Sequence, residues 1–140
     1  MTFIDLPTQR QVIWIVGKKG NEGKTFLQNY IRYFFGDRRV VTTDINGRKK
    51  DIADYLTKLP LECKDIFLFN NPASSSENIA YDLLEAIKDG GILSHKYNTN
   101  CLTFKTPNTV VVFSNNHPNQ LALKNDRWRK PFHHKFVHQR

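Results

Sequence analysis

The segment from Gln11 to Gly36 constrains the fold more than any other part of the chain. It begins with the apolar, β-branched run QVIWIV, which predicts a buried strand. A glycine- and lysine-rich loop follows from Gly17 to Gly23, and apolar side chains then recur at helical spacing. These side chains are Phe26, Leu27, Tyr30, Ile31, Phe34 and Phe35. A strand, a glycine-rich loop and a helix that ends at a glycine predict the first unit of an α/β sheet.

Further apolar runs of strand length alternate with segments of helical periodicity along the rest of the chain. Strands are expected at residues 39–43, 65–69 and 110–114, and helices at residues 47–60 and 75–90. Strands and helices alternate in this way when crossover helices join parallel strands. We therefore expect a single α/β domain over the whole chain, with a mostly parallel sheet and flanking helices.

Local composition refines the second half of the chain. The helix expected at residues 75–90 has serines at its front, a residue type that caps helices, and Gly90 at its end. From Ile92 to Phe104 the alternation weakens and Gly, Asn and Thr appear, which predicts a β-hairpin. The tail from Leu121 is basic and aromatic.

The glycine-rich loop has the residue types of a phosphate-binding P-loop. Glycines let successive backbone N–H groups point at phosphate oxygens, and the following helix N-terminus adds a positive dipole. Lys24 is expected to reach the β- and γ-phosphates of ATP, and the Thr25 hydroxyl to ligate Mg²⁺. The usual pattern GxxxxGK[ST] places its first glycine at Lys18, whereas Gly17 lies one residue further out. The expected nucleotide contacts are Gly17, Gly20, Asn21, Glu22, Gly23, Lys24 and Thr25.

Amides stand where hydrolysis of ATP would favour a carboxylate. The strand expected at residues 65–69 is followed by Asn70 and Asn71. An amide can accept a hydrogen bond from a magnesium-bound water, but it has no charge and cannot act as a base. The alternative interpretation of this pair is a simple turn before Pro72. Asn115, after the strand at residues 110–114, is a candidate for orienting the attacking water or contacting the γ-phosphate, or else a turn residue.

Cationic and aromatic residues in the second half of the chain predict an anionic partner. Lys96 and Tyr97, in the expected hairpin, pair a phosphate contact with a base-stacking ring, although an ordinary hairpin with a solvated lysine explains them equally well. Arg127 is a candidate for a charge supplied to the nucleotide of a neighbouring subunit, or for a surface ion pair. The net charge of +8 favours nucleic acid, nucleotides or acidic lipid as partners.

Location is constrained by what the sequence lacks. It has no apolar run long enough to cross a bilayer, and MTFIDLPTQRQ has no apolar core of a signal peptide. Cys63 and Cys101 are isolated from each other and from any CxxC pattern, which argues against a zinc cluster or a disulfide framework. We expect a nuclear or cytoplasmic protein that is neither secreted nor membrane-bound.

Four segments in this order resemble the helicase part of the replication-associated (Rep) proteins of circular single-stranded DNA viruses, which belongs to helicase superfamily 3. WIVGKKGNEGKTFLQ is similar to the phosphate loop of that family, in which GNEGKT with a shifted first glycine is a common form. FNNPASSSENIAYDLLEAIKDGGILSHKY resembles its Walker B strand, the following helix and a lysine-bearing hairpin. TPNTVVVFSNNHP is similar to motif C, and LKNDRW to the motif that ends in the arginine finger.

The resemblance implies a role for each matching residue. Lys24 and Thr25 would bind Mg-ATP, Asn115 would sense the γ-phosphate, and Arg127 would act on a neighbouring subunit. Lys96 would contact single-stranded DNA. Domains of this type form rings, commonly hexamers, in which ATP hydrolysis moves DNA-binding hairpins and unwinds DNA during replication in a host cell.

Two departures from the family pattern keep alternatives open. The Walker B aspartate of the family falls on Asn70, and the arginine that usually follows the proline falls on Ala73. A nucleotide- and DNA-binding remnant that no longer hydrolyses ATP is therefore the second hypothesis, and a related RNA helicase of an RNA virus is the third. A small-molecule kinase is disfavoured because no arginine-rich lid is evident. The N-terminal nicking endonuclease of the family is expected to be absent from this chain.

Overall fold

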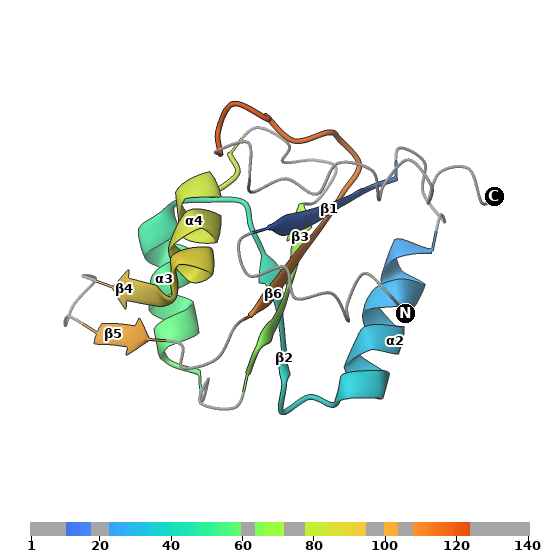
Figure 1. Cartoon of the computed structure of the whole chain (residues 1–140), viewed down its shortest axis with the longest axis horizontal. Coiled ribbons are helices and arrows are strands. Elements are labelled where there is room, and N and C mark those ends of the chain that lie inside the picture. The colour runs from blue at the N-terminus through green and yellow to red at the C-terminus, as the bar shows by residue number, and fades with distance from the viewer. Residues whose placement is uncertain are drawn as a thin grey trace.

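A computed structural model describes residues 11–17, 23–59, 64–71, 78–94, 100–103 and 108–123 of the chain. The described part forms three layers, with a parallel sheet between one helix and a pair of helices (Figure 1). A short two-stranded ribbon lies on the outer side of the helix pair (Figure 1). The predicted α/β class, with a mostly parallel sheet and flanking helices, is confirmed.

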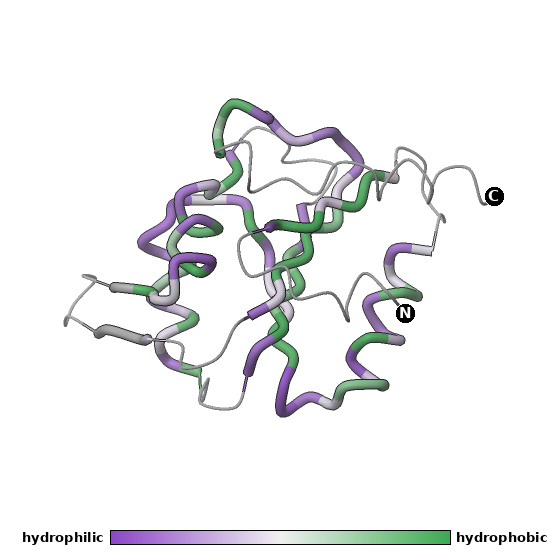
Figure 2. Tube along the Cα trace, viewed as in Figure 1, coloured by the Kyte–Doolittle hydropathy of each residue, from purple (hydrophilic) through white to green (hydrophobic). Residues whose placement is uncertain are grey.

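Within the described residues, the central sheet has four parallel strands in the order β1-β6-β3-β2. The strands are β1 (Val12–Val16), β2 (Val40–Asp44), β3 (Ile66–Asn71) and β6 (Thr109–Ser114). Most of their residues are apolar, many of them β-branched, as expected for strands that helices cover on both faces. The tube of β1, β3 and β6 is correspondingly green over most of its length in Figure 2.

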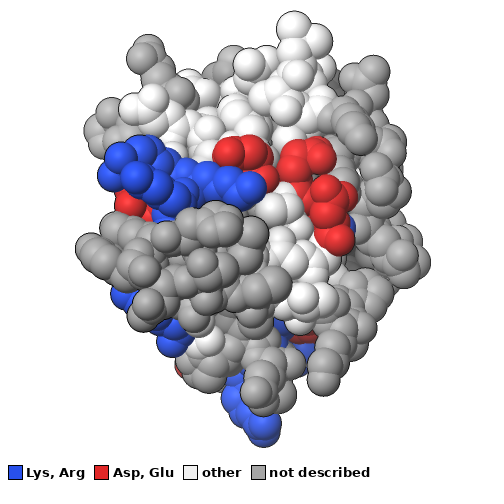
Figure 3. Space-filling view, turned by 90° about the vertical axis from the view of Figure 1, so that its left-hand side faces the viewer, with Lys and Arg blue, Asp and Glu red and all other residues white. Residues whose placement is uncertain are grey.

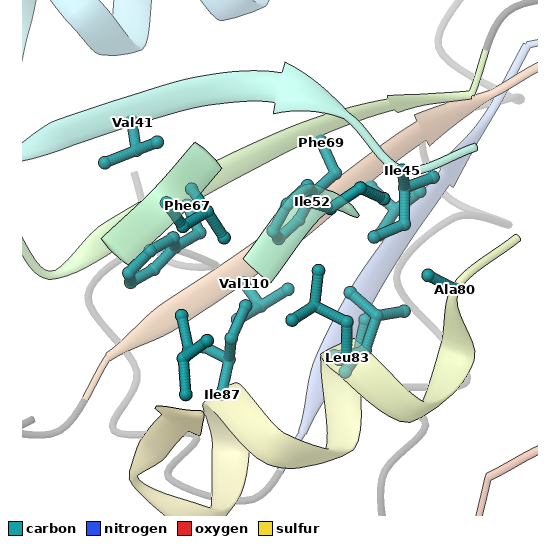
Figure 4. Packing of buried hydrophobic residues seen from close by; sticks show 14 of the residues in the cluster. Val41, Ile45, Ile52, Phe67, Phe69, Ala80, Leu83, Ile87 and Val110 are labelled. Atoms are coloured by element: carbon teal, nitrogen blue, oxygen red, sulfur yellow. The ribbon is translucent and has the colours of Figure 1, made fainter. Parts of the chain in front are cut away.

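Helix α2 (Lys24–Phe35) covers one face of the sheet, and helices α3 (Lys49–Thr57) and α4 (Tyr81–Asp89) cover the other (Figure 1). Leu27 and Ile31 of α2 belong to one buried cluster with alternate strand residues. The remaining strand residues pack with α3 and α4 in a larger cluster, seen in Figure 4. Two apolar faces on each strand thus fix the three-layer arrangement.

The larger cluster contains most of the buried apolar side chains of the described residues. Phe67 and Phe69 of β3 stack with ring centroids 6.3 Å apart, and both are 0% exposed. Leu83 and Ile87 of α4 point toward the same strands (Figure 4). Because burying one such side chain stabilises a fold by about 1.5–3 kcal/mol, this cluster holds α4 against the sheet.

Helix α4 begins later than the sequence indicated. Its first residue is Tyr81, and its N-cap Ala80 makes no side-chain hydrogen bond. Ile79 instead forms an isolated antiparallel β-bridge with Asn46, which keeps the preceding backbone extended. The prediction that serines cap this helix is therefore wrong, because a tertiary backbone contact overrides the local capping pattern. The predicted end of the helix is confirmed, since Gly90 is the C-cap with a φ of 108°.

Strands β4 (Gly91–Ser94) and β5 (Asn100–Thr103) pair antiparallel and confirm the predicted hairpin. The ribbon lies against α3 and α4, on the side of these helices away from the sheet (Figure 1). The residues between the two strands, including Lys96 and Tyr97, lie outside the described residues.

The outer surface of α2 carries several aromatic side chains. The exposed fractions are 76% for Phe26, 44% for Tyr30, 89% for Tyr33 and 64% for Phe34. Tyr30 and Phe34 stack one helical turn apart, with ring centroids separated by 6.0 Å. Of the apolar positions that predicted this helix, Leu27 and Ile31 are buried, and Phe35 packs partly buried against the same cluster.

The opposite side of the molecule has a mixed charge. Seen from the side of α3 and α4, a group of Lys and Arg side chains lies next to a group of Asp and Glu side chains (Figure 3). Charges of both signs also pair along α3, where Arg48 pairs with Asp51 and Lys58 with Asp54. The described part of this face is therefore not a continuous basic surface. Within the described residues, no helix is both long and apolar enough to span a membrane.

Candidate phosphate-binding site at the carboxyl edge of the sheet

The predicted site residues that the structure describes lie at the carboxyl edge of the parallel sheet. In the strand order, β6 lies between β1 and β3, so the residues after β6 face both neighbouring strand ends. The Gly17 N–H donates to the carbonyl of Ser114 at 2.9 Å, which joins the end of β1 to the end of β6. Ligands of open α/β sheets bind at this kind of edge.

Lys24 links three segments of the edge. It is the first residue of α2, and its Nζ donates to the Gly17 carbonyl oxygen at 2.7 Å and to Asn115 Oδ1 at 2.5 Å. The structure therefore brings together Gly17, Lys24 and Asn115. The two acceptors are a backbone carbonyl oxygen and a side-chain amide oxygen, both of them neutral groups.

A glycine in a left-handed conformation caps the start of α2. Gly23 is the N-cap with a φ of 91°, a left-handed conformation that favours glycine. Its carbonyl accepts the first helical hydrogen bond from the Leu27 N–H at 2.8 Å. Thr25, in the first turn, is exposed. A helix N-terminus, an ammonium group and an exposed hydroxyl are thus combined at one point, which suits a polyphosphate anion.

Asn70 is held against α2 by a reciprocal pair of amide hydrogen bonds. Gln28 Nε2 donates to Asn70 Oδ1 at 2.7 Å, and Asn70 Nδ2 donates to Gln28 Oε1 at 3.2 Å. Gln28 is only 8% exposed and lies one helical turn after Lys24. The sequence reasoning missed Gln28, although its spacing of one turn from Lys24 places both residues on one side of the helix.

A second polar network lies on the other face of the same strand ends. Asn71 Nδ2 donates to Ser114 Oγ at 2.8 Å, and Asn46 Nδ2 donates to Asn71 Oδ1 at 2.8 Å. Ser114 Oγ also accepts from the Asn116 N–H at 3.0 Å. Asn71 and Ser114 are 4% and 0% exposed, so the network fixes the strand ends from within the core.

Both asparagines belong to β3, which ends at Asn71 rather than at Phe69. The alternative interpretation of the pair as a simple turn is therefore wrong. Successive strand residues point to opposite faces, and this explains why Asn70 contacts α2 while Asn71 contacts Ser114.

The loop after β6, which carries Asn115, is anchored by aromatic residues. Trp14 Nε1 donates to the carbonyl of Asn116 at 2.9 Å, and the Trp14 ring stacks on Tyr81 with centroids 6.0 Å apart. The Asn119 N–H donates to the Tyr81 hydroxyl oxygen at 2.8 Å. Burial raises the pKa of Tyr81, while its hydrogen bond with Asn119 acts in the opposite direction. These contacts hold the backbone that follows Asn115.

Several predicted site residues lie outside the described residues. They are Gly20, Asn21, Glu22, Lys96, Tyr97 and Arg127. Within the described residues, no group of three or more His, Cys, Asp or Glu side chains is arranged to hold a metal ion. A divalent cation at this edge would therefore depend on isolated oxygen donors together with a ligand such as phosphate.

The sheet is parallel, and a glycine-capped helix follows its strand β1. Lys24 at the start of this helix contacts the residues that follow β1 and β6, which are neighbours in the sheet. These features define an α/β protein compatible with a P-loop-like fold. Its homologues are viral replication proteins. The chain is 30% identical over 118 residues to a "Master replication protein" of Milk vetch dwarf virus (isolate N), an alignment that covers 84% of this chain and 38% of that protein. No protein-family model matches the chain.

Other relatives agree with this one. The "Master replication protein" of Faba bean necrotic yellows virus (isolate Syrian SV292-88) is also 30% identical, over 84% of this chain and 38% of its own length. "Para-Rep C9" of Faba bean necrotic yellows C9 alphasatellite is 29% identical over 86% of this chain and 41% of its own length. The chain thus spans well under half of the length of each of these curated relatives.

Proposed function

We propose that this chain is an ATP-dependent helicase domain of a viral replication-associated protein, which binds Mg-ATP and single-stranded DNA and unwinds DNA during replication. The similarity to master replication proteins supports a role in replication. The position of Lys24, bonded to Gly17 and Asn115 across the edge of the sheet, is the observation that carries the nucleotide-binding part of the proposal.

Lys24 would exchange the neutral oxygens of Gly17 and Asn115 for phosphate oxygens. A hydrogen bond between an ammonium group and an anionic oxygen is about twice as strong as one between neutral groups, so the exchange is favourable. It would free Asn115 Oδ1 and leave the Asn115 amide facing the terminal phosphate. The N–H groups at the start of α2 would stabilise the same anion.

The donor chemistry at this edge fits a magnesium ion that is held mainly by phosphate. Mg²⁺ binds oxygen ligands and keeps several of its waters, which one hydroxyl and one amide oxygen can accommodate. Thr25 would supply the hydroxyl and Asn70 the amide. When bound, Mg²⁺ would neutralise charge on the transferring phosphoryl group.

The remaining roles follow from the resemblance to superfamily 3 helicases. Glu22 and the neighbouring loop residues would surround the phosphates, and Arg127 would reach the nucleotide of the next subunit in a ring. Lys96 and Tyr97, between β4 and β5, would contact single-stranded DNA. The confirmed hairpin and the net charge of +8 support this assignment.

A second candidate function is a binding module that holds nucleotide and DNA without hydrolysis. It is favoured by the amide at Asn70, which Gln28 contacts through both of its polar atoms. Neither amide can accept a proton from water near neutral pH. RNA in place of DNA is a variant of both candidates.

The deciding experiment measures binding of a fluorescent ATP analogue and steady-state ATP hydrolysis, with and without single-stranded DNA or RNA. Lys24→Ala should weaken nucleotide binding about 10–100-fold, because it removes a charged hydrogen bond of about 1.5–3 kcal/mol. The exposed Lys50 of α3 offers a matched control, since Lys50→Ala should bind as the wild type does.

Three outcomes separate the candidates. Hydrolysis that single-stranded DNA stimulates, and that Lys24→Ala abolishes, supports the helicase. Binding without hydrolysis above the Lys24→Ala background supports the binding module. Equal binding by wild type and Lys24→Ala contradicts nucleotide recognition at this edge.

A further inference from the structure

Asp44 stands directly beside the position that lacks a carboxylate. It is the last residue of β2, and in the parallel pairing of β2 with β3 its Cα is the partner of Asn70. Neighbouring strands lie about 4.8 Å apart, so Asp44 is displaced from Asn70 by one strand spacing. Its side chain is exposed at the same carboxyl edge as Lys24 and Asn115.

Asp44 lies on the face of the sheet that α2 covers. Val40, at the other end of β2, belongs to the buried cluster of Leu27 and Ile31. Because side chains alternate along a strand, Asp44 shares the face of Val40. Asn70, its partner, also faces α2, as the contact with Gln28 requires.

Among the described carboxylates, Asp44 is the one that ends a strand of the central sheet at this edge. Asp65 precedes β3 at the opposite edge and pairs with Arg39 at 2.8 Å. Asp51 and Asp54 lie on α3, on the other face of the sheet, in ion pairs with Arg48 and Lys58. Among these described acidic residues, Asp44 is therefore the one that follows the strands to the carboxyl edge of the sheet, on the face covered by α2.

We infer that Asp44 supplies the negative charge that Asn70 lacks, and that its carboxylate anchors the magnesium of Mg-ATP through a bound water. This inference rests on the proposed nucleotide binding and extends it. Contact through a water follows from the strand spacing, since Asp44 lies one strand beyond Asn70. The Gln28–Asn70 amide pair would then hold the Asn70 side chain in place, while the Asp44 carboxylate supplies the negative charge near the magnesium ion.

The test is the magnesium dependence of binding for a fluorescent, non-hydrolysable ATP analogue, which needs no turnover. Removing a carboxylate that holds a metal-bound water typically costs about 10–100-fold in metal affinity. Asp44→Asn should therefore raise, by at least about tenfold, the Mg²⁺ concentration at which the Mg²⁺-dependent increase in affinity for the ATP analogue is half-maximal. Affinity without Mg²⁺ should remain as in the wild type. Asp37→Asn, an exposed acidic position before the other end of β2, is the matched control and should behave as the wild type.

A rescue distinguishes loss of charge from damage to the fold. Asn70→Asp added to Asp44→Asn returns a carboxylate one strand away and should restore the Mg²⁺ enhancement. Circular dichroism of each variant checks that it is folded. An unchanged Mg²⁺ dependence in Asp44→Asn, or a double variant that stays as impaired as the single one, overturns the role of Asp44. If the wild type binds no nucleotide with or without Mg²⁺, the proposed function itself fails.

Discussion

The amide pair of Gln28 and Asn70 makes the stability of Asn70→Asp predictable. In the wild type, each amide donates to the other, at 2.7 Å and 3.2 Å. An aspartate keeps the acceptor at 2.7 Å but cannot donate, so Gln28 Oε1 loses its partner and faces a carboxylate oxygen. The substitution therefore exchanges one hydrogen bond for a contact between two acceptors.

The size of the effect follows from these two contacts. The shorter bond becomes charge-assisted and gains about 1 kcal/mol, whereas leaving Gln28 Oε1 without a donor costs about 1–3 kcal/mol. Gln28 is 8% exposed, so water compensates little of this cost. The balance is a loss of about 1 kcal/mol in the free energy of unfolding near neutral pH.

The pH dependence has a definite sign. A protonated carboxyl can donate to Gln28 Oε1 and restore both contacts, so the fold raises the pKa of the introduced group above its usual value of about 3.9. The loss relative to wild type should therefore be small near about pH 4 and grow as the pH rises through the raised pKa.

Urea denaturation of wild type and variant at several pH values measures this difference. Asn119→Asp makes the same chemical change at an exposed residue whose Oδ1 accepts from the Leu121 N–H, and it should change stability by less than about 0.5 kcal/mol. A loss in Asn70→Asp that is equal at low and neutral pH, or no loss at all, would refute the reciprocal pairing.

Two further predictions concern the aromatic anchor and the core. Tyr81→Phe keeps the ring against Trp14 but removes the acceptor of the Asn119 N–H, so it should cost about 0.5–1.5 kcal/mol in urea denaturation; no cost would contradict that bond. Burial raises the pKa of Tyr81, so ionisation of its hydroxyl above about pH 10 destabilises the folded wild type relative to the unfolded chain. The difference in unfolding free energy between wild type and Tyr81→Phe should therefore shrink as the pH rises above about 10. Leu84→Ala should cost about 2–5 kcal/mol, since Leu84 is 0% exposed, whereas Leu121→Ala, at a residue 94% exposed, should stay within about 0.5 kcal/mol. Similar losses in the two leucine variants would contradict the described packing.

The sequence predicts the elements well where one pattern dominates. The apolar runs that became β1, β3 and β6 are buried on both faces, which leaves a continuous apolar stretch and no ambiguity with surface loops. The hairpin of β4 and β5 was predicted from its composition alone. The start of α4 was wrong because the bridge of Ile79 with Asn46 is a contact between distant segments, which no local pattern records.

The site residues likewise differ in how far the local sequence predicts them. Lys24 was predictable because the phosphate-loop pattern is local to the sequence. Its contact with Asn115 depends on β6 lying next to β1, and this neighbourhood follows from sheet order rather than from sequence distance. Gln28 and Asp44 were not predicted from the sequence. Gln28 contacts Asn70 and Asp44 pairs with it, but Asn70 lies on a strand that is remote from both residues in sequence.

The strand order also affects when this protein can fold during its synthesis. Among the described strands of the central sheet, β6 is the last to leave the ribosome, yet it separates β1 from β3, and Val12 pairs with Val110. Until β6 emerges, β1 lacks its partner in the sheet, and closing so long a loop slows folding. Asn115, whose amide oxygen accepts a hydrogen bond from Lys24, is made later still. Nascent chains that stop before this point would hold an unpaired apolar strand and a lysine without its asparagine, so they are candidates for chaperone binding and degradation.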